Sequence, residues 1–202
     1  MRKVVVTNII SLDGAFSGAG GDVMAMPFDE GFDVYIAERL AAAETVLLGA
    51  VSYREFLTFW PSVVDDENSP QIERDFSRAY NEVDKLVVSD TLRPEETGAW
   101  ASTTTIIPRS QAHDEVAELR RGNGGEIVIY GSHVLWNDLL AHGLVDELHL
   151  MVGPAVIGGT GRPAGGVPAF QDCEPARFEL LEVREFEASG IVLLRYATQL
   201  TA

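Results

Sequence analysis

Short apolar runs rich in β-branched residues alternate with segments of helical spacing, and this alternation limits the possible folds more than any other feature of the sequence. We expect strands at residues 3–10, 45–49, 85–89, 103–107 and 126–130. We expect helices at residues 28–43, 51–59, 71–83, 110–121 (with Ser110 as the N-cap) and 132–142. Because neighbouring parallel strands need long connections that pack back on the sheet, the pattern predicts an α/β fold with a mostly parallel sheet in three layers.

The C-terminal third has a different pattern. A strand at residues 145–152 is followed by a Gly/Pro-rich loop at 153–175, and strands at 177–186 and 191–198 flank a short turn at Ala188, Ser189 and Gly190. These last two strands should form an antiparallel hairpin and complete an eight-stranded sheet. No repeat or low-complexity tract marks a second domain, so residues 1–202 are expected to form one domain. The long loops at 11–27 and 153–175 are candidates for functional loops.

Charge and cysteine content exclude several classes of protein. Fifteen basic and thirty-one acidic residues give a net charge of −16, which disfavours nucleic acid and anionic membranes as partners. Cys173 is the only cysteine, so no intramolecular disulfide can form, and a reducing, cytoplasmic location is expected. No apolar stretch approaches the ~20 residues needed to span a bilayer. The four histidines show no metal-ligand spacing, and we expect no metal site.

A series of short motifs follows the expected strands. In chain order they are Ser11-Leu12-Asp13-Gly14, Val46-Leu47-Leu48-Gly49 leading into Ser52-Tyr53, Phe59-Trp60-Pro61, Leu86-Val87-Val88-Ser89-Asp90-Thr91-Leu92, Ile127-Val128-Ile129-Tyr130-Gly131-Ser132, Gly143-Leu144-Val145-Asp146-Glu147-Leu148 and Pro154-Ala155-Val156-Ile157-Gly158. In this order the chain resembles stand-alone proteins related to the C-terminal reductase domain of the riboflavin biosynthesis protein RibD, within the dihydrofolate reductase superfamily. The resemblance covers nearly the whole chain and implies a dihydrofolate reductase-like fold.

The resemblance implies a site for NADPH at the ends of three strands. Its expected residues are Gly49, Ala50, Ser52, Ser89, Asp90, Gly131, Ser132 and His133. Gly131 and Ser132 occur where a strand turns into a helix, so free backbone N–H groups and the positive helix end can face a pyrophosphate. A plain strand-to-helix turn with Ser132 as the N-cap is the alternative.

Three residues depart from the family pattern. Ala50 and Val51 stand where relatives usually carry Arg or Lys, and Asp90 stands where many carry Arg. A carboxylate would repel the 2′-phosphate of NADPH but can accept hydrogen bonds from a free ribose hydroxyl. NADH is therefore the alternative cofactor, unless Arg54 or Arg93 supplies the missing positive charge.

Two acidic residues are candidates for catalysis. Dihydrofolate reductases carry an acid on the first helix, and Asp33 stands at the corresponding distance before Gly49. Such a carboxyl group can orient a substrate ring and help to deliver a proton, although a solvated acid beside Asp29, Glu30 and Glu38 is at least as compatible with the pattern. Asp13 lies in the loop that covers the nicotinamide in relatives, and its alternative is an Asp-Gly turn.

The sequence therefore predicts an oxidoreductase that transfers hydride from NADPH or NADH to a C=N or C=O bond of a small, pterin- or aminopyrimidine-like substrate. A non-catalytic ligand-binding protein of the same fold and a reductase that uses a flavin are the alternatives. The Pro-Cys-x-x-Cys pattern of a zinc deaminase is absent, and the fold does not imply a role in riboflavin biosynthesis. The resemblance also implies a homodimer. Glu147 begins or lies within its strand and is expected to be exposed, with a side chain that points into the cleft as the alternative.

Overall fold

Eight strands form one sheet in the order β5-β4-β3-β6-β1-β7-β10-β9; β10 pairs antiparallel with β7 and β9, and the other pairs are parallel. The computed structural model describes residues 1–159, 165–171 and 173–198. The strands are β1 (Val4–Ser11), β3 (Ala43–Gly49), β4 (Asp84–Val88), β5 (Thr104–Ile107), β6 (Glu126–Tyr130), β7 (Glu147–Gly153), β9 (Glu179–Glu185) and β10 (Val192–Ala197). The expected sheet and its antiparallel hairpin are confirmed.

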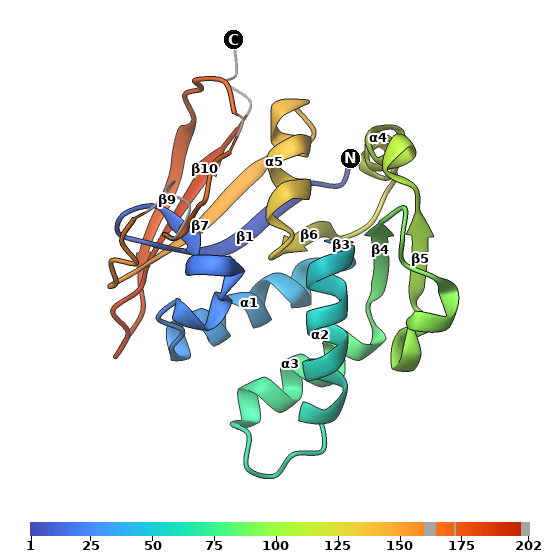
Figure 1. Ribbon diagram of the computed structural model, residues 1–202, viewed down its shortest axis with the longest axis horizontal. Coiled ribbons are helices and arrows are strands. Elements are labelled where there is room, and N and C mark those ends of the chain that lie inside the picture. Colours follow the sequence, from blue (N-terminus) through green and yellow to red (C-terminus); the bar gives the residue numbers. More distant parts are fainter. Residues whose placement is uncertain (160–164, 172, 199–202) are drawn as a thin grey trace.

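Helices cover both faces of the sheet. They are α1 (Glu30–Ala42), α2 (Ala50–Val63), α3 (Gln71–Glu82), α4 (Ala112–Arg121) and α5 (His133–Ala141). Figure 1 shows α1, α2 and α3 on one side of the sheet and α4 and α5 on the other. Two apolar clusters follow this division, because one contains side chains of α1, α2 and α3 and the other contains side chains of α4 and α5. The three-layer prediction is thus confirmed.

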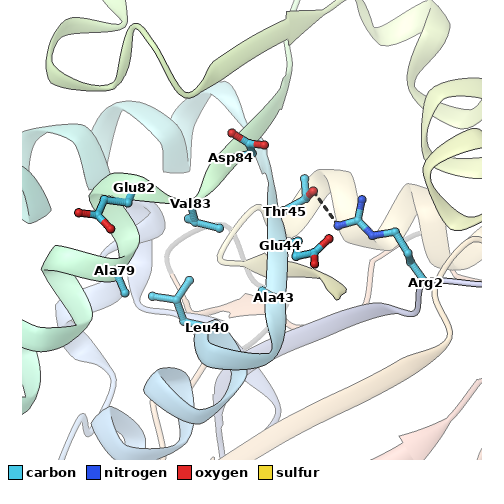
Figure 2. A pocket seen from close by; sticks show the side chains of 9 residues that line it. All are labelled: Arg2, Leu40, Ala43, Glu44, Thr45, Ala79, Glu82, Val83 and Asp84. Atoms are coloured by element: carbon cyan, nitrogen blue, oxygen red, sulfur yellow. Dashed lines mark hydrogen bonds between the residues drawn. The ribbon is translucent and has the colours of Figure 1, made fainter. Parts of the chain in front are cut away.

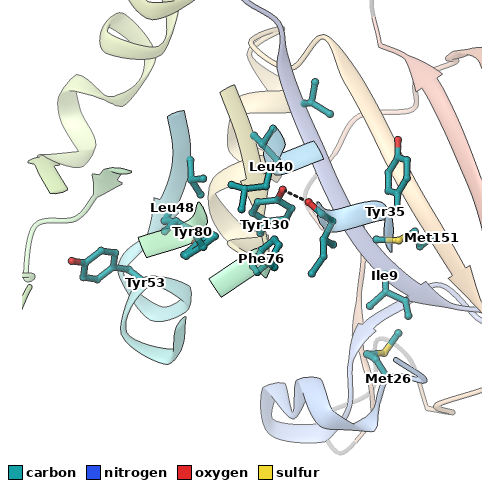
Figure 3. Packing of buried hydrophobic residues seen from close by; sticks show 14 of the residues in the cluster. Ile9, Met26, Tyr35, Leu40, Leu48, Tyr53, Phe76, Tyr80, Tyr130 and Met151 are labelled. Atoms are coloured by element: carbon teal, nitrogen blue, oxygen red, sulfur yellow. Dashed lines mark hydrogen bonds between the residues drawn. The ribbon is translucent and has the colours of Figure 1, made fainter. Parts of the chain in front are cut away.

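The cluster beneath α1, α2 and α3 is rich in aromatic residues. Figure 3 shows Tyr35, Tyr53, Phe76, Tyr80 and Tyr130 between these helices and the sheet. The hydroxyl of Tyr130 donates to the carbonyl of Ile36 at 2.9 Å, which satisfies a polar group in this otherwise apolar layer. This packing fixes α1 against β6 and so fixes the position of the first turn of α1.

The two long loops pair with each other. Residues Ala15–Ser17 (β2) and Val167–Pro168 (β8) form a small antiparallel sheet that the sequence did not predict. Its strands have only three and two residues, too few to leave a pattern in the sequence. The described residues include no helix that is long and apolar enough to cross a membrane.

The helix ends differ from the expected ones. Ser110 does not cap α4, because a 3-10 turn at Arg109–Gln111 precedes the helix and no side-chain cap is present. Helix α2 continues past Phe59 to Val63 with Pro61 in its last turn. Helix α1 starts at Glu30, where Asp29 accepts hydrogen bonds from the backbone N–H groups of Gly31 and Phe32.

Candidate active site

The carboxyl ends of β3 and β6 lie side by side, and the helices that follow them leave on opposite faces of the sheet. The two strands pair in parallel; α2 follows β3 toward one face and α5 follows β6 toward the other. In open α/β sheets, ligands bind at such a position, outside the carboxyl ends of the strands. We call residues 49–52 and 131–134 the β3/β6 junction. It contains Gly49, Ala50, Ser52, Gly131, Ser132 and His133 of the expected cofactor residues.

Two hydrogen bonds cross the β3/β6 junction. The N–H of Gly49 donates to Oγ of Ser132 at 3.0 Å, and the N–H of Ser132 donates to Oγ of Ser52 at 2.8 Å. Each serine therefore holds the backbone of the other segment. The hydroxyl of Ser132 does not cap its own helix, so the N-cap interpretation of this side chain is wrong.

The backbone at the turn of β6 is left-handed over two residues. Gly131 has φ +58° and Ser132 has φ +51°, a conformation that costs a non-glycine residue about 1–2 kcal/mol. A Cβ on Gly131 would lie 2.8 Å from Oγ of Ser52, so only glycine fits. Asn8 of β1 stabilises this turn, since its side chain accepts from the N–H of Gly131 at 2.8 Å and donates to its carbonyl at 3.3 Å. The sequence analysis missed Asn8, although a polar residue inside an apolar strand is a usable signal.

Neither helix at the β3/β6 junction has a side-chain cap. Gly49 is the N-cap residue of α2 and Ser132 that of α5, and in both the first-turn N–H groups lack a capping side chain. These donors and the positive ends of two helices occur at neighbouring strands. The residues present thus fit a diphosphate group, and the small side chain of Ala50 leaves the backbone accessible.

Ser89 and Asp90 follow the next strand, β4. Oγ of Ser89 accepts from the N–H groups of Thr91 and Leu92, so this hydroxyl shapes the turn. Asp90 is more than half exposed; it accepts from the N–H of Arg109 at 3.0 Å and lies 3.8 Å from the guanidinium of the same residue. Arg54 pairs with Glu96 at 3.0 Å. The basic group beside Asp90 is therefore Arg109, which the sequence analysis did not consider.

Asp13 joins the two long loops. Its carboxylate accepts from the hydroxyl of Ser11 at 2.6 Å and from the N–H groups of Ile157 and Gly158 at 3.1 and 2.8 Å. These contacts position the loop that follows β7 against the loop that follows β1.

His133 fastens the same loops to α5. Its Nε2 lies 2.8 and 3.1 Å from the carbonyl oxygens of Pro168 and Ala169, and its ring stacks on Phe16. Burial lowers the pKa of His133, and the two carbonyl contacts oppose this shift. The neutral ring thus holds β2 and β8 over the start of α5. Gly161, in the Gly/Pro-rich loop at residues 153–175, lies outside the described residues.

Asp33 lies in the first turn of α1. This turn begins near the carboxyl edge, because Pro27 contacts Gly153 at the end of β7. Burial, first, and then the negative charges of Glu73, Asp29 and Glu30 together raise the pKa of Asp33 to about 6. Its carboxyl group accepts no hydrogen bond from the described part of the chain. A half-buried acid with these properties can hold a proton near neutral pH.

Asp29 and Glu38 have structural partners, contrary to the solvated role considered for them, whereas Glu30 is exposed. Asp29 accepts from the hydroxyl of Ser189 at 2.8 Å and from the N–H of Gly190 at 3.3 Å, in addition to capping the helix. Glu38 forms a two-point ion pair with Arg184 of β9. The C-terminal hairpin therefore holds the helix that carries Asp33.

Glu147 belongs to a buried polar network, so its expected exposure is wrong. It is 4% exposed and binds Lys3, the Nε2 of His149 at 2.8 Å and Arg195 at 2.9 Å. These donors hold the pKa of Glu147 well below its usual range. Because a carboxylate only accepts, Nε2 of His149 carries the proton and Nδ1 accepts from the hydroxyl of Tyr35 at 2.8 Å. The network ties α1 to β1, β7 and β10.

Two cavities lie away from the carboxyl edge. One, of about 520 Å³, lies at the amino ends of β3 and β4, where Figure 2 shows Glu44, Glu82 and Asp84 around it and Arg2 donating to Thr45. The other, of about 460 Å³, lies between α1 and α3. Neither is lined by an expected site residue, so neither is the site described above.

Exposed apolar side chains gather along the carboxyl edge instead. Leu12, Val51, Val134 and Val156 follow shortly after β1, β3, β6 and β7 and are 64–75% exposed. Single exposed apolar side chains thus follow the carboxyl ends of four strands.

The sheet order, the helix layers and the β3/β6 junction define a dihydrofolate reductase-like α/β fold. A dihydrofolate reductase from Enterococcus faecalis, complexed with NADP(H) and RAB-propyl, shares it with a TM-score of 0.59 at 11% identity, over 96% of this chain and 95% of that one. The chain belongs to the RibD C-terminal domain family, whose family model matches residues 2–192.

Two further relatives match nearly end to end. A putative riboflavin biosynthesis protein from Shewanella sp. PV-4 has a TM-score of 0.65 at 21% identity and covers 98% of both chains. The uncharacterized protein YyaP of Bacillus subtilis (strain 168) is 26% identical over 96% of this chain and 94% of its own length. These similarities support the expected family and fold.

Proposed function

We propose that this protein is a nicotinamide-dependent reductase whose dinucleotide lies along the carboxyl edge of the sheet. The observation that carries the proposal is the β3/β6 junction, where two uncapped helix N-termini are locked together by the hydrogen bonds of Ser52 and Ser132. Such an arrangement recognises a diphosphate by backbone N–H groups and helix dipoles. Family membership supports the same assignment.

Each group of site residues has a proposed role in cofactor binding or proton transfer. Ala50, Ser52, Gly131 and Ser132 would hold the diphosphate, while Ser89 and Asp90 would contact the adenosine ribose. The bound nicotinamide supplies the hydride. Asp33, protonated near pH 6, would donate the proton that must accompany hydride addition to a C=N or C=O bond.

Asp13 and His133 act on the loops rather than on the reacting atoms. Their contacts hold the two long loops together beside the β3/β6 junction, where the loops can exclude water. Both residues are therefore assigned as positioning residues. Family membership supports a pterin- or aminopyrimidine-like heterocycle as the proposed substrate class.

The first experiment is a calorimetric titration of the purified protein with NADPH and with NADH, followed by turnover assays on pterins, aminopyrimidines and small carbonyl compounds. We expect saturable binding of one nicotinamide dinucleotide per chain and its oxidation with at least one heterocycle. Binding without turnover on any compound would favour the ligand-binding protein. Absence of binding to both dinucleotides would refute the proposal, and a yellow protein would indicate a flavin.

We also propose a homodimer that uses the edge strand β9. Leu180, Leu181 and Val183 are 45–56% exposed on this strand, which has one sheet neighbour. A long exposed apolar edge favours association. Sedimentation at several concentrations should show a dimer that Val183→Glu converts to monomer, with Glu185→Gln on the same strand as the control. A wild-type monomer at high concentration would contradict the dimer.

A further inference from the structure

Two histidines and an aspartate from different helices meet on the side of the sheet that carries α4 and α5. Nε2 of His113, in the first turn of α4, lies 2.7 Å from Oδ2 of Asp138 on α5. Nδ1 of His142, at the end of α5, lies 3.5 Å from Oδ1 of the same aspartate. The two imidazole rings are 4.0 Å apart between centroids. Sequence spacing had given no sign of this group, because His113 is distant from the other two.

The geometry of these side chains suits a metal ion. One ligand atom from each residue can be chosen so that all three lie within 4.8 Å of one another. Zinc binds imidazole nitrogen and carboxylate oxygen at about 2.0 Å, which separates the ligands of a tetrahedral ion by about 3.3 Å. Rotation of the imidazole rings would bring the three atoms to that separation, and Nδ1 of His142 also lies 2.8 Å from the backbone carbonyl of Asp138.

The position of the group separates it from the proposed reductase site. The nine residues of α5 span about 13 Å, with the β3/β6 junction at the start of the helix and His142 just beyond its end. The three side chains are 43–52% exposed, so a metal ion has access from solvent. A net charge of −16 also raises the local concentration of cations.

We propose that His113, Asp138 and His142 bind one divalent transition-metal ion, of the class of Zn²⁺ or Ni²⁺, which fastens α4 to α5. Two imidazoles with one carboxylate select such ions over Mg²⁺ and Ca²⁺, which prefer oxygen ligands. Water completes the coordination, since the site is open to solvent. Binding links two elements that are separate in the unfolded chain, and so it stabilises the fold.

The test is a calorimetric titration of tag-free, chelator-treated protein with ZnCl₂, because a polyhistidine tag would itself bind zinc. We expect one ion per chain, and a rise of about 5 °C in Tm when free zinc exceeds the Kd about 100-fold. His113→Ala and His142→Ala should each weaken binding at least tenfold. Co²⁺ should give a visible absorption band that both variants lose.

Matched controls separate this site from nonspecific binding. Asp114→Asn removes an exposed acid next to His113, and Cys173→Ser removes the single thiol; both should bind zinc like the wild type. Circular dichroism confirms that the variants are folded. Wild-type affinity in either histidine variant, loss of binding in Cys173→Ser, or no binding at millimolar zinc would overturn the proposal.

Discussion

The backbone N–H of Gly49 donates to Oγ of Ser132, 83 residues further along the chain, at 3.0 Å. This contact sets the distance between the first turns of α2 and α5. A ligand that spans both turns therefore depends on the Ser132 hydroxyl even without touching it.

Ser132→Ala should weaken both the fold and dinucleotide binding. The variant leaves the N–H of Gly49 without its acceptor, which costs about 1–2 kcal/mol in the free energy of unfolding. The variant also loses the hydrogen bond that holds the first turns of α2 and α5 at a fixed distance. We therefore expect calorimetry to show about tenfold weaker binding of NADPH or NADH. Ser62→Ala, which removes an exposed hydroxyl on α2, is the control. If Ser132→Ala and Ser62→Ala had equal stability and equal dinucleotide affinity, Ser132 would not join the two turns as proposed.

Asp33→Asn should remove the pH dependence of turnover. The wild-type rate should be constant below about pH 6 and fall above it, because the donor must be protonated. The variant should be slower by about 10²-fold or more, with no step near pH 6. Glu30→Gln, an exposed acid in the same turn, should shift the step slightly downward, since Glu30 contributes to the raised pKa. A step near pH 6 that persists in Asp33→Asn would exclude Asp33 as the donor.

The same substitution should stabilise the fold at neutral pH. The pKa of Asp33 is raised from 3.8 to about 6 on folding, so the folded state favours the protonated acid. The stability that this provides is complete below about pH 3.8 and is lost as the pH rises through 6. Urea titration should thus give Asp33→Asn a larger free energy of unfolding than the wild type at pH 7.5 but not at pH 4. An unstable variant at pH 7.5 would indicate a structural role.

Asp90→Asn should favour NADPH over NADH. The substitution removes a negative charge from the proposed ribose site and leaves Arg109 as the nearest charged neighbour. Calorimetry should show several-fold tighter binding of NADPH and little change for NADH. Asp84→Asn, at the opposite end of β4, is the control. Unchanged affinity for both dinucleotides would place the adenosine end elsewhere.

Glu147→Gln should cost more stability than Glu182→Gln, although both residues bind Arg195. Loss of the buried carboxylate removes the charged acceptor of Lys3 and His149, while Arg195 keeps Glu182, and it should lower the free energy of unfolding by about 2 kcal/mol at pH 7. Glu182 is 38% exposed, so its loss should cost less than about 1 kcal/mol. Because the pKa of Glu147 is depressed, the difference should shrink as the pH falls below 4.5. Equal decreases in the free energy of unfolding for the two variants at pH 7 would show that burial does not strengthen the contacts of Glu147.

The sequence predicted the sheet because each strand leaves a local signal, a short β-branched run between polar segments. The distant partners of Asp29, Asp13 and Glu147 leave none, because Ser189, Gly158 and Lys3 lie more than 100 residues from them. The resemblance directed attention to Asp33 and the β3/β6 junction. It could not reveal that Ser132 binds Gly49 rather than its own helix, which depends on the left-handed backbone at Ser132.

The contact of Asp29 with Ser189 and Gly190 has a consequence for the order of assembly during synthesis. The helix with the candidate proton donor is synthesised well before the hairpin that holds it, because Asp29 and Ser189 are 160 residues apart. Strand β10 inserts between β7 and β9 at the same late stage. The packing of Tyr130 against α1 can form earlier, but the contacts of Ser189 and Gly190 with Asp29 form only once the hairpin has left the ribosome.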